Sequence, residues 1–202
     1  MGNPAIDRDA HYTYRHYRTW PDEERWELID GQAWVMSPAP VSNHQRVVGS
    51  LSFLFLSYVR GKPFEAFIAP FDVMIPRGDE PDDEVDSIVQ PDLCVYRDRS
   101  RVTRRGGSGA PDLVVEVLSP RTSKKDQNDK FRLYERSGVL EYWVVDIGNR
   151  SVCVYRPLQN PGEPPCFDEG ELREPDYDFS PLASVVLEGF SIEPAALFEN
   201  VV

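Results

Sequence analysis

The segment of residues 90–145 constrains the fold of this chain most, because it places acidic residues inside two strongly apolar strands. The first predicted strand, residues 88–96, contains Asp92, and the second, residues 112–118, contains Glu116 in the run Leu-Val-Val-Glu-Val-Leu. A carboxylate is costly to bury unless it is paired or holds a cation. We therefore expect these two acids to have a partner in the folded protein.

A helix is predicted directly after the second strand and ends near Ser137, where the following Gly138 is a typical C-terminal signal. Asp126, Lys130 and Tyr134 follow one another at intervals of four residues in this helix, so they share one face. If the two strands are neighbours in one sheet, the helix can place Asp126 and Lys130 over their acids.

This combination of side chains suits phosphodiester hydrolysis. Two carboxylates within reach of each other repel unless a cation lies between them. Oxygen ligands favour a hard ion, Mg²⁺ or Mn²⁺, whose shell is completed by water. A nearby lysine, here Lys130, can position a metal-bound water or offset charge on a phosphate. Two structural explanations stay open: Asp126 and Lys130 can form a helix ion pair worth about 0.3–0.5 kcal/mol, or the acids are simply tolerated in a structural hairpin.

The remaining pattern predicts a single domain of residues 1–202. A hairpin is predicted at residues 25–36, because Asp30-Gly31 is a strong two-residue turn signal. Further strands are expected at residues 64–76, 140–147, 151–156 and 183–187, and helices at residues 12–20, 42–60 (with Ser42 as N-cap) and 194–198. An acidic and a basic loop are expected at residues 77–87 and 97–110, and residues 157–182, rich in Pro and acid, are expected to form a loop that can include one strand.

Glu27 and His44 are further candidates outside the central segment. Glu27 lies on the first arm of the hairpin, where it either joins the site or faces solvent as an ordinary strand acid. His44 falls on the apolar stripe of the predicted helix 42–60. A lone histidine there is more often a satisfied helix-end residue than a catalytic one, so both interpretations stay open.

The charge of the chain is unevenly distributed. The net charge is −12, which argues against a non-specific nucleic-acid coat protein. Residues 97–136 nevertheless contain 11 of the 22 Lys and Arg residues and only 6 acids. A basic rim around an acidic site suits a polyanion held over a cation, and its candidates for substrate contact are Arg104, Arg105, Lys124 and Lys125. A solvated loop and helix face explains the same charges.

Several classes of protein are disfavoured by the composition. No run of 18 apolar residues indicates a membrane span, and the N-terminus lacks the apolar core of a signal peptide. The three cysteines, Cys94, Cys153 and Cys166, lack metal-ligand spacing, and the first two lie in predicted strands. A reduced, cytoplasmic protein is the expectation.

The order of several motifs resembles one known family. The segments ELIDG, SPAPVSNHQ, QPDL, PDLVVEVLSP and GVLEYWVVD, with an Asp-x3-Lys-x3-Tyr pattern before the last, are similar to the Uma-two family of restriction-endonuclease-like proteins. That family is placed in the PD-(D/E)xK nuclease superfamily, and the resemblance extends from Tyr12 to Phe198. It implies an α/β (α+β) restriction-endonuclease-like fold, with a mixed central sheet flanked by helices, a divalent metal and DNA as substrate.

The resemblance also implies roles for individual residues. Asp92 matches the acid of the family's PD motif, and Glu116 matches its second strand acid. The superfamily pattern places a lysine two residues after that glutamate, where this chain has Leu118, and the resemblance points to Lys130 on the helix instead. Glu27 matches the acid of the hairpin. Two other matched positions have less defined roles: His44 and Asp126.

Three functional hypotheses follow. The first is a Mg²⁺- or Mn²⁺-dependent endonuclease in which Asp92 and Glu116 hold the metal, with Lys130 and Glu27 completing the site. The second is a nuclease fold that binds nucleic acid or a protein partner without turnover. The third is a dimeric scaffold whose interface is formed by the apolar hairpins around Tyr142, Trp143 and Tyr155. A homodimer is compatible with each hypothesis.

Overall fold

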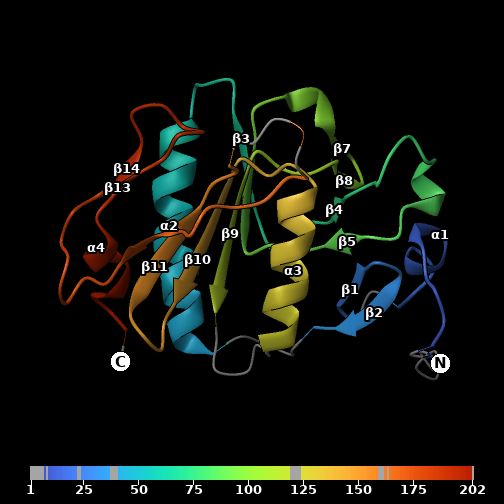
Figure 1. Ribbon diagram of the computed structural model, residues 1–202, viewed down its shortest axis with the longest axis horizontal. Coiled ribbons are helices and arrows are strands. Elements are labelled where there is room, and N and C mark those ends of the chain that lie inside the picture. The colour runs from blue at the N-terminus through green and yellow to red at the C-terminus, as the bar shows by residue number, and fades with distance from the viewer. Residues whose placement is uncertain are drawn as a thin grey trace.

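The fold is known from a computed structural model that describes residues 7, 9–21, 24–36, 41–118, 124–158, 162 and 164–201, without the side chains of residues 124–127. Its described part combines two six-stranded mixed sheets, a two-stranded sheet and four α-helices (Figure 1). This is the mixed α+β architecture expected from the sequence. The single sheet of that expectation is replaced by two.

The first large sheet carries the acids that the sequence singles out. Its order is β12-β11-β10-β9-β6-β3, formed by Glu171–Arg173, Ser151–Tyr155, Glu141–Asp146, Leu113–Leu118, Leu93–Tyr96 and Glu65–Ile68. Strands β9 and β10 are parallel, whereas the other pairs are antiparallel. A parallel pair needs a crossover connection, which helix α3 (Lys124–Arg136) provides. The crossover fixes α3 beside the strand that contains Glu116.

The second large sheet contains the N-terminal hairpin. Its order is β2-β1-β5-β4-β8-β7, formed by Gln32–Val35, Trp26–Ile29, Ile88–Val89, Val73–Met74, Gly106–Ser108 and Val102–Thr103. The hairpin turns at Asp30 and Gly31 with φ values of 54° and 76°, as its sequence predicts. Strands β7 and β8 lie within residues 97–110, where the sequence predicts only a loop.

The predicted strand at residues 88–96 is divided between the two sheets. Strand β5 ends at Val89 and pairs with β1 and β4, whereas β6 begins at Leu93 and pairs with β3 and β9. Pro91 lies at the break, because proline has no N–H to donate to a strand ladder. The two strands from residues 64–76, β3 and β4, are divided in the same way. Asp92 therefore lies where the chain passes from one sheet to the other.

Two helix predictions need correction. Helix α1 covers only Tyr14–Tyr17, shorter than the predicted residues 12–20. Helix α2 covers Ser42–Val59, and its N-cap is Val41, so the prediction of Ser42 as N-cap is wrong by one residue. Helix α4, Pro194–Phe198, has the predicted bounds and proline in its first turn. The remaining short elements are β13 and β14, at Leu182–Ala183 and Ser191–Ile192, and the 3₁₀ turns Asp82–Glu84 and Arg99–Arg101.

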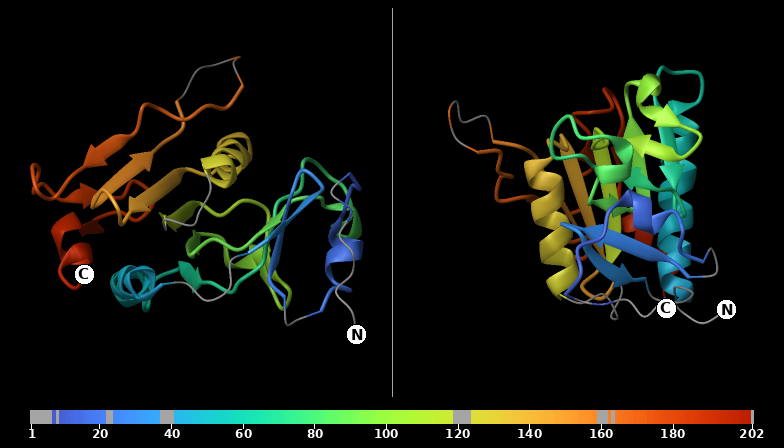
Figure 2. Two further views of the ribbon diagram at one scale, coloured as in Figure 1. Left: turned by 90° about the horizontal axis from the view of Figure 1, so that it is seen from below. Right: turned by 90° about the vertical axis from the view of Figure 1, so that its right-hand side faces the viewer.

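The core lies on both faces of the first sheet. Figure 2 shows α2 on one face of this sheet and α3 on the other. Phe55 of α2 packs edge-on against Trp143, with ring centroids 5.9 Å apart, and Tyr134 of α3 packs against Tyr142 at 5.1 Å. Tyr142 and Trp143 are thus buried inside the chain, which contradicts the hypothesis that their hairpin forms a subunit interface.

None of the helices in the described ranges is long and apolar enough to cross a membrane.

Candidate active site

Asp92 and Glu116 lie near each other where β6 and β9 pair. The register of these strands pairs Leu93 with Val115 and Cys94 with Val114, which places Asp92, one residue before β6, level with Glu116. The backbone N–H of Val117 donates to Oδ2 of Asp92 at 2.8 Å, which holds that carboxylate over β9. The charge of Asp92 contributes to the raised pKa of Glu116, so the two acids interact.

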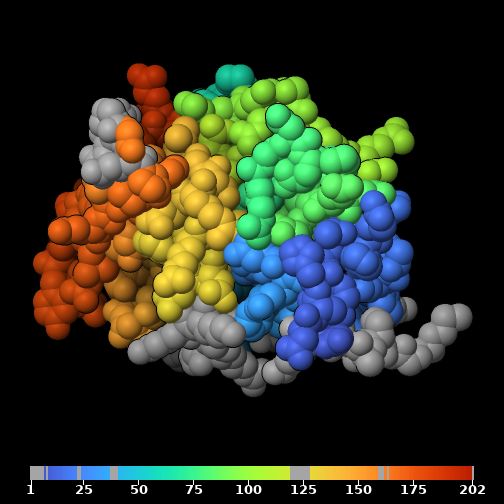
Figure 3. Space-filling view, turned by 45° about the vertical axis from the view of Figure 1, so that its right-hand side comes forward, coloured from blue at the N-terminus to red at the C-terminus, as the bar shows by residue number. Residues whose placement is uncertain are grey.

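Lys130 reaches Glu116 and Glu27 from α3. Its Nζ lies 2.9 Å from Oε1 of Glu116 and 2.8 Å from Oε1 of Glu27 on β1. All three side chains are at most 12% exposed. Figure 3 shows how α3 lies against the β1–β2 hairpin, so the lysine joins the two sheets. The three residues that the sequence places on a hairpin, a strand and a helix therefore meet.

Tyr134 is a site residue that the sequence reasoning did not select. One helical turn after Lys130, its hydroxyl donates to Oε1 of Glu116 at 2.8 Å. Burial raises the pKa of Tyr134 well above its usual value, and Glu116 and Glu27 raise it further, so the hydroxyl keeps its proton. The sequence does contain a signal for this position, because Tyr134 continues the four-residue spacing of Asp126 and Lys130. Its hydroxyl helps to fix the rotamer of the Glu116 carboxylate.

His44 contacts the acid on the other side of the site. It belongs to the first turn of α2, and its Nε2 lies 3.3 Å from Oδ2 of Asp92. Burial alone lowers the pKa of His44, but hydrogen bonds to Asp92 and to the backbone of Val117 and the charges of Asp92 and Glu116 outweigh it, so the pKa is raised. Among the described residues, Nδ1 of His44 has no hydrogen-bond partner. The helix-end histidine is therefore bound to a candidate metal ligand.

The site contains more negative than positive charge. Burial raises the pKa of Glu116 to about 7, and the charges of Asp92 and Glu27 add to the increase, whereas Lys130 opposes it. Burial disfavours the charged form of Lys130, but Glu116 and Glu27 more than compensate and raise its pKa. Lys130 is thus a permanent cation. One ammonium and one imidazole face three carboxylates, an imbalance that a bound cation would neutralise.

The donor set fits a hydrated Mg²⁺ or Mn²⁺ ion better than a closed metal cage. Within the described ranges, no group of three or more His, Cys, Asp and Glu side chains is arranged to hold a metal ion. Magnesium usually binds one or two carboxylates and keeps several waters, so it does not need such a group. Asp92 and Glu116 would supply the two carboxylates.

Comparisons with known proteins show the family and the fold of this chain. Residues 14–183 match a family model, Uma2, described as "Putative restriction endonuclease". This chain belongs to the Uma2 family. A crystal structure described as a "putative nuclease belonging to DUF820", from Anabaena variabilis, has a TM-score of 0.69 at 21% identity and covers 92% of this chain and 97% of its own. This likeness shows that the two proteins share a fold.

A curated relative of this Uma2 chain is the uncharacterized protein slr1290 of Synechocystis. The two are 29% identical over 131 residues, which are 64% of this chain and 65% of the relative. The match thus covers less than two thirds of the relative's length.

The structure describes only some of the basic side chains of the Uma2 chain that were predicted to contact substrate. Arg104 and Arg105 lie in the turn between β7 and β8, and Arg105 is 3.8 Å from the carboxylate of Asp82. Three strands separate β7 from β1, which corresponds to about 19 Å at the usual strand spacing. The structure therefore does not bring these two arginines to the carboxylate site. The side chains of Lys124, Lys125 and Asp126 lie outside the described residues.

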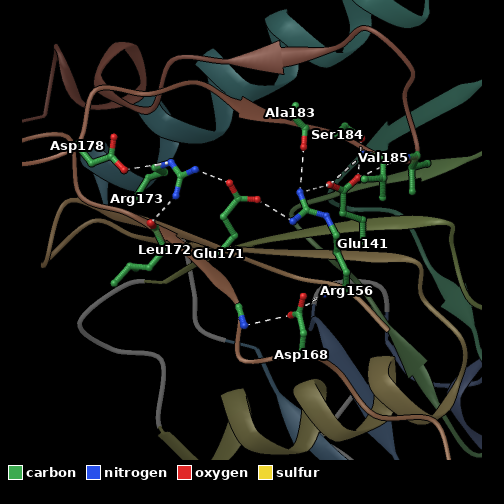
Figure 4. A network of polar contacts seen from close by, with 12 residues as sticks. Glu141, Arg156, Asp168, Glu171, Leu172, Arg173, Asp178, Ala183, Ser184 and Val185 are labelled. Carbon is green, nitrogen blue, oxygen red and sulfur yellow. Dashed lines mark hydrogen bonds and ion pairs between the residues drawn. The ribbon is translucent and has the colours of Figure 1, made fainter. Parts of the chain in front are cut away.

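A second buried acid, Glu141, forms a different kind of network (Figure 4). It is completely buried and accepts hydrogen bonds from the Ser184 hydroxyl at 2.6 Å and from the backbone amides of Val185 and Val186. The guanidinium of Arg156 lies 3.2 Å from its Oε1 and neutralises its charge. Each carboxylate oxygen is thus bonded within the chain, so the network attaches the C-terminal segment to β10.

The comparison of Glu141 with Glu116 separates a structural acid from a functional candidate. Both are buried strand acids in the same sheet. Glu141 shares Arg156 with Glu171, and Glu171 also binds Arg173, so two guanidiniums serve these two acids; Glu116 and Glu27 share a single ammonium, and Asp92 lies nearby. Perturbed, under-neutralised carboxylates are typical of catalytic sites.

Proposed function

We propose that this protein is a metal-dependent endonuclease that hydrolyses phosphodiester bonds in DNA. The observation that carries the proposal is the contact of Lys130 with Glu116, a buried acid whose pKa is raised by burial and by the nearby charge of Asp92. Membership of the Uma2 family supports the same reaction class. The proposal extends that support to the metal, to the DNA substrate and to the roles of individual residues.

Asp92 and Glu116 would hold the ion, Mg²⁺ or Mn²⁺. The bound ion supplies a Lewis acid and an acidified water at neutral pH. Val117 N–H and Tyr134 hydroxyl orient the two carboxylates, so the ligands need little rearrangement. His44 contacts the same oxygen of Asp92 that accepts the Val117 N–H, so it would also help to hold this carboxylate.

Lys130 would stabilise charge on the substrate. An ammonium has three N–H donors, and two of them are directed to Glu27 and Glu116. The third can donate to a phosphoryl oxygen or to the attacking water. Because its pKa is raised, Lys130 keeps its proton and acts as a charge stabiliser rather than as a general base. Glu27 holds the ammonium in place and does not need to contact substrate.

The test is cleavage of supercoiled plasmid DNA in the presence of Mg²⁺ or Mn²⁺. Asp92→Asn, Glu116→Gln and Lys130→Met should each reduce the rate by at least about 10²-fold, the typical effect of removing one transition-state contact. Asp112→Asn is a matched control, because Asp112 begins the same strand pair but binds Arg97 at 3.0 Å. Cleavage by Asp92→Asn or Glu116→Gln at the wild-type rate, with intact circular dichroism, would exclude the proposed mechanism.

Binding without turnover is the second candidate function. The pairing of Lys130 with both Glu27 and Glu116 favours it, because the cation already compensates part of the charge that a metal would neutralise. Titration calorimetry with MnCl₂ discriminates between the two functions. Heat of binding that is lost in Asp92→Asn supports the nuclease, whereas no binding at millimolar Mn²⁺ supports the silent module.

A further inference from the structure

Arg25 carries a guanidinium that is fixed in place beside the candidate active site. It lies one residue before β1, and its carbonyl accepts the backbone N–H of Met36 at 2.9 Å, so the hairpin pairing continues through it. Side chains two residues apart in an extended chain point to the same face. Arg25 and Glu27 therefore face the same way.

The guanidinium is held by a neutral group. Its Nε and Nη2 donate to Oε1 of Gln90 at 3.0 and 2.6 Å, a two-point contact with an uncharged amide oxygen. Other arginines of this acidic chain bind carboxylates directly: Arg97 binds Asp112 and Arg156 binds Glu141. Among the described hydrogen bonds of Arg25, none is to a carboxylate, so its positive charge remains available.

Gln90 is itself fixed from its other end. Its Nε2 donates to Oδ1 of Asp72 at 2.7 Å, and the hydroxyl of Tyr17 donates to the same oxygen at 2.9 Å. A carboxylate only accepts and a guanidinium only donates, so the orientation of the amide is determined by its neighbours. Burial raises the pKa of Tyr17, with Asp72 adding to the increase, and its hydroxyl stays protonated. Arg25 is thus held by a chain of defined hydrogen bonds.

The same glutamine connects Arg25 to the reaction centre. The backbone N–H of Gln90 donates to Oε1 of Glu27 at 2.7 Å, the oxygen that also binds Lys130. Gln90 lies two residues before Asp92 on the segment that crosses between the sheets. Gln90 therefore connects the guanidinium of Arg25 with Glu27, which binds Lys130, and with the segment that contains Asp92.

We propose that Arg25 binds a phosphate group of the nucleic-acid substrate next to the bond that is cleaved, and that Gln90 holds its guanidinium in position. This inference depends on the proposed function. A guanidinium presents five N–H donors in a fork that matches phosphate oxygens, and two nitrogens of Arg25 are engaged by Gln90, which leaves Nη1 available. In a protein of net charge −12, contact with a polyanion depends on such locally placed cations.

The experiment measures DNA binding separately from cleavage. Fluorescence anisotropy of a labelled DNA duplex is recorded in CaCl₂ at several NaCl concentrations for the wild type, Arg25→Gln, Arg25→Lys and Gln90→Met. Arg97→Gln is the matched control, because it removes the same charge from an exposed arginine paired with Asp112. Thermal unfolding of each variant establishes that it is folded.

Arg25→Gln should weaken binding by about tenfold or more, the usual effect of losing a charge-assisted hydrogen bond. It should also reduce the slope of log K against log salt by about 0.9, the effect of one lost phosphate contact. Arg25→Lys should keep that slope and lose part of the affinity, and so should Gln90→Met. Arg97→Gln should leave both quantities near the wild-type values.

The outcomes separate this inference from the proposed function. An unchanged salt slope in Arg25→Gln, a loss no larger than that of Arg97→Gln, or a wild type that does not bind the duplex would overturn the role of Arg25. If binding depends on Arg25 but the wild type does not cleave DNA with Mg²⁺ or Mn²⁺, the phosphate contact of Arg25 holds, whereas hydrolysis and a place beside a cleaved bond are rejected. If cleavage depends on Asp92 but DNA binding does not depend on Arg25, hydrolysis holds and the role of Arg25 is rejected.

Discussion

Replacement of Lys130 by methionine tests the electrostatic account of the site. The ammonium lies 2.8 and 2.9 Å from two buried carboxylates, so the variant leaves both of them close together without their cation. Removing one partner of a buried ion pair costs about 3–5 kcal/mol. The cost is relieved at low pH, because Glu116, whose pKa is already about 7, can take up a proton. The destabilisation should therefore be near this range at pH 8 and clearly smaller at pH 5.5.

Calorimetric unfolding of Lys130→Met at the two pH values measures this difference. For a protein of this length, 1 kcal/mol corresponds to about 2–4 °C in Tm, so the loss at pH 8 should be roughly 6–20 °C. Adding Glu116→Gln to Lys130→Met should restore part of it, since one of the unpaired charges is removed. Lys62→Met is the control, because that ammonium lies over the ring of Tyr58 rather than between acids. An equal Tm loss at both pH values, or none at pH 8, would refute the reasoning.

Three further outcomes are expected. Folding raises the pKa of Glu116 from 4.5 to about 7. The free energy of unfolding of the metal-free wild type should therefore decrease as pH rises through that interval. In Glu116→Gln, urea denaturation at several pH values should show no such decrease from this residue. Glu141→Gln removes the charge of a fully buried acid that is paired with the partly exposed Arg156, and it should cost up to about 3–5 kcal/mol by urea denaturation. An effect below 1 kcal/mol would contradict the structural role of its network. Gly107→Ala places a Cβ 2.0 Å from the hydroxyl of Tyr96 and should lower stability by about 1–3 kcal/mol, whereas Gly49→Ala, which meets no atom within 4 Å, should not.

The sequence predicted many of the elements and the chemistry of the candidate site. The turn at Asp30-Gly31 and the final helix after Pro194 follow from local conformational preferences and are confirmed. The misfit of Glu116 in an apolar strand pointed to a partner, and the structure supplies Lys130 and Tyr134. The division of residues 88–96 between two sheets was missed, although Pro91 marks the break.

The contacts of Glu27 and Arg25 could not be predicted from local sequence patterns, although the family resemblance pointed to Glu27. Glu27 and Lys130 are separated by about a hundred residues and meet only because α3 packs beside β1. In the sequence, Gln90 is an ordinary polar residue before a proline. Only the structure shows that its side-chain amide contacts Asp72, Tyr17 and Arg25. Their significance depends on hydrogen bonds between distant segments.

The amino-acid sequence by itself determined the approximate positions of most strands and helices and which residue types are available for chemistry, because both depend on side-chain periodicity and turn preferences over a few residues. The tertiary structure alone decided which charges face one another. Which charges meet follows from how the apolar faces of α2, α3 and the two sheets pack against one another. This packing joins segments that are far apart in the sequence, so short sequence patterns do not predict it. The three carboxylates and single ammonium of the site are a result of that packing.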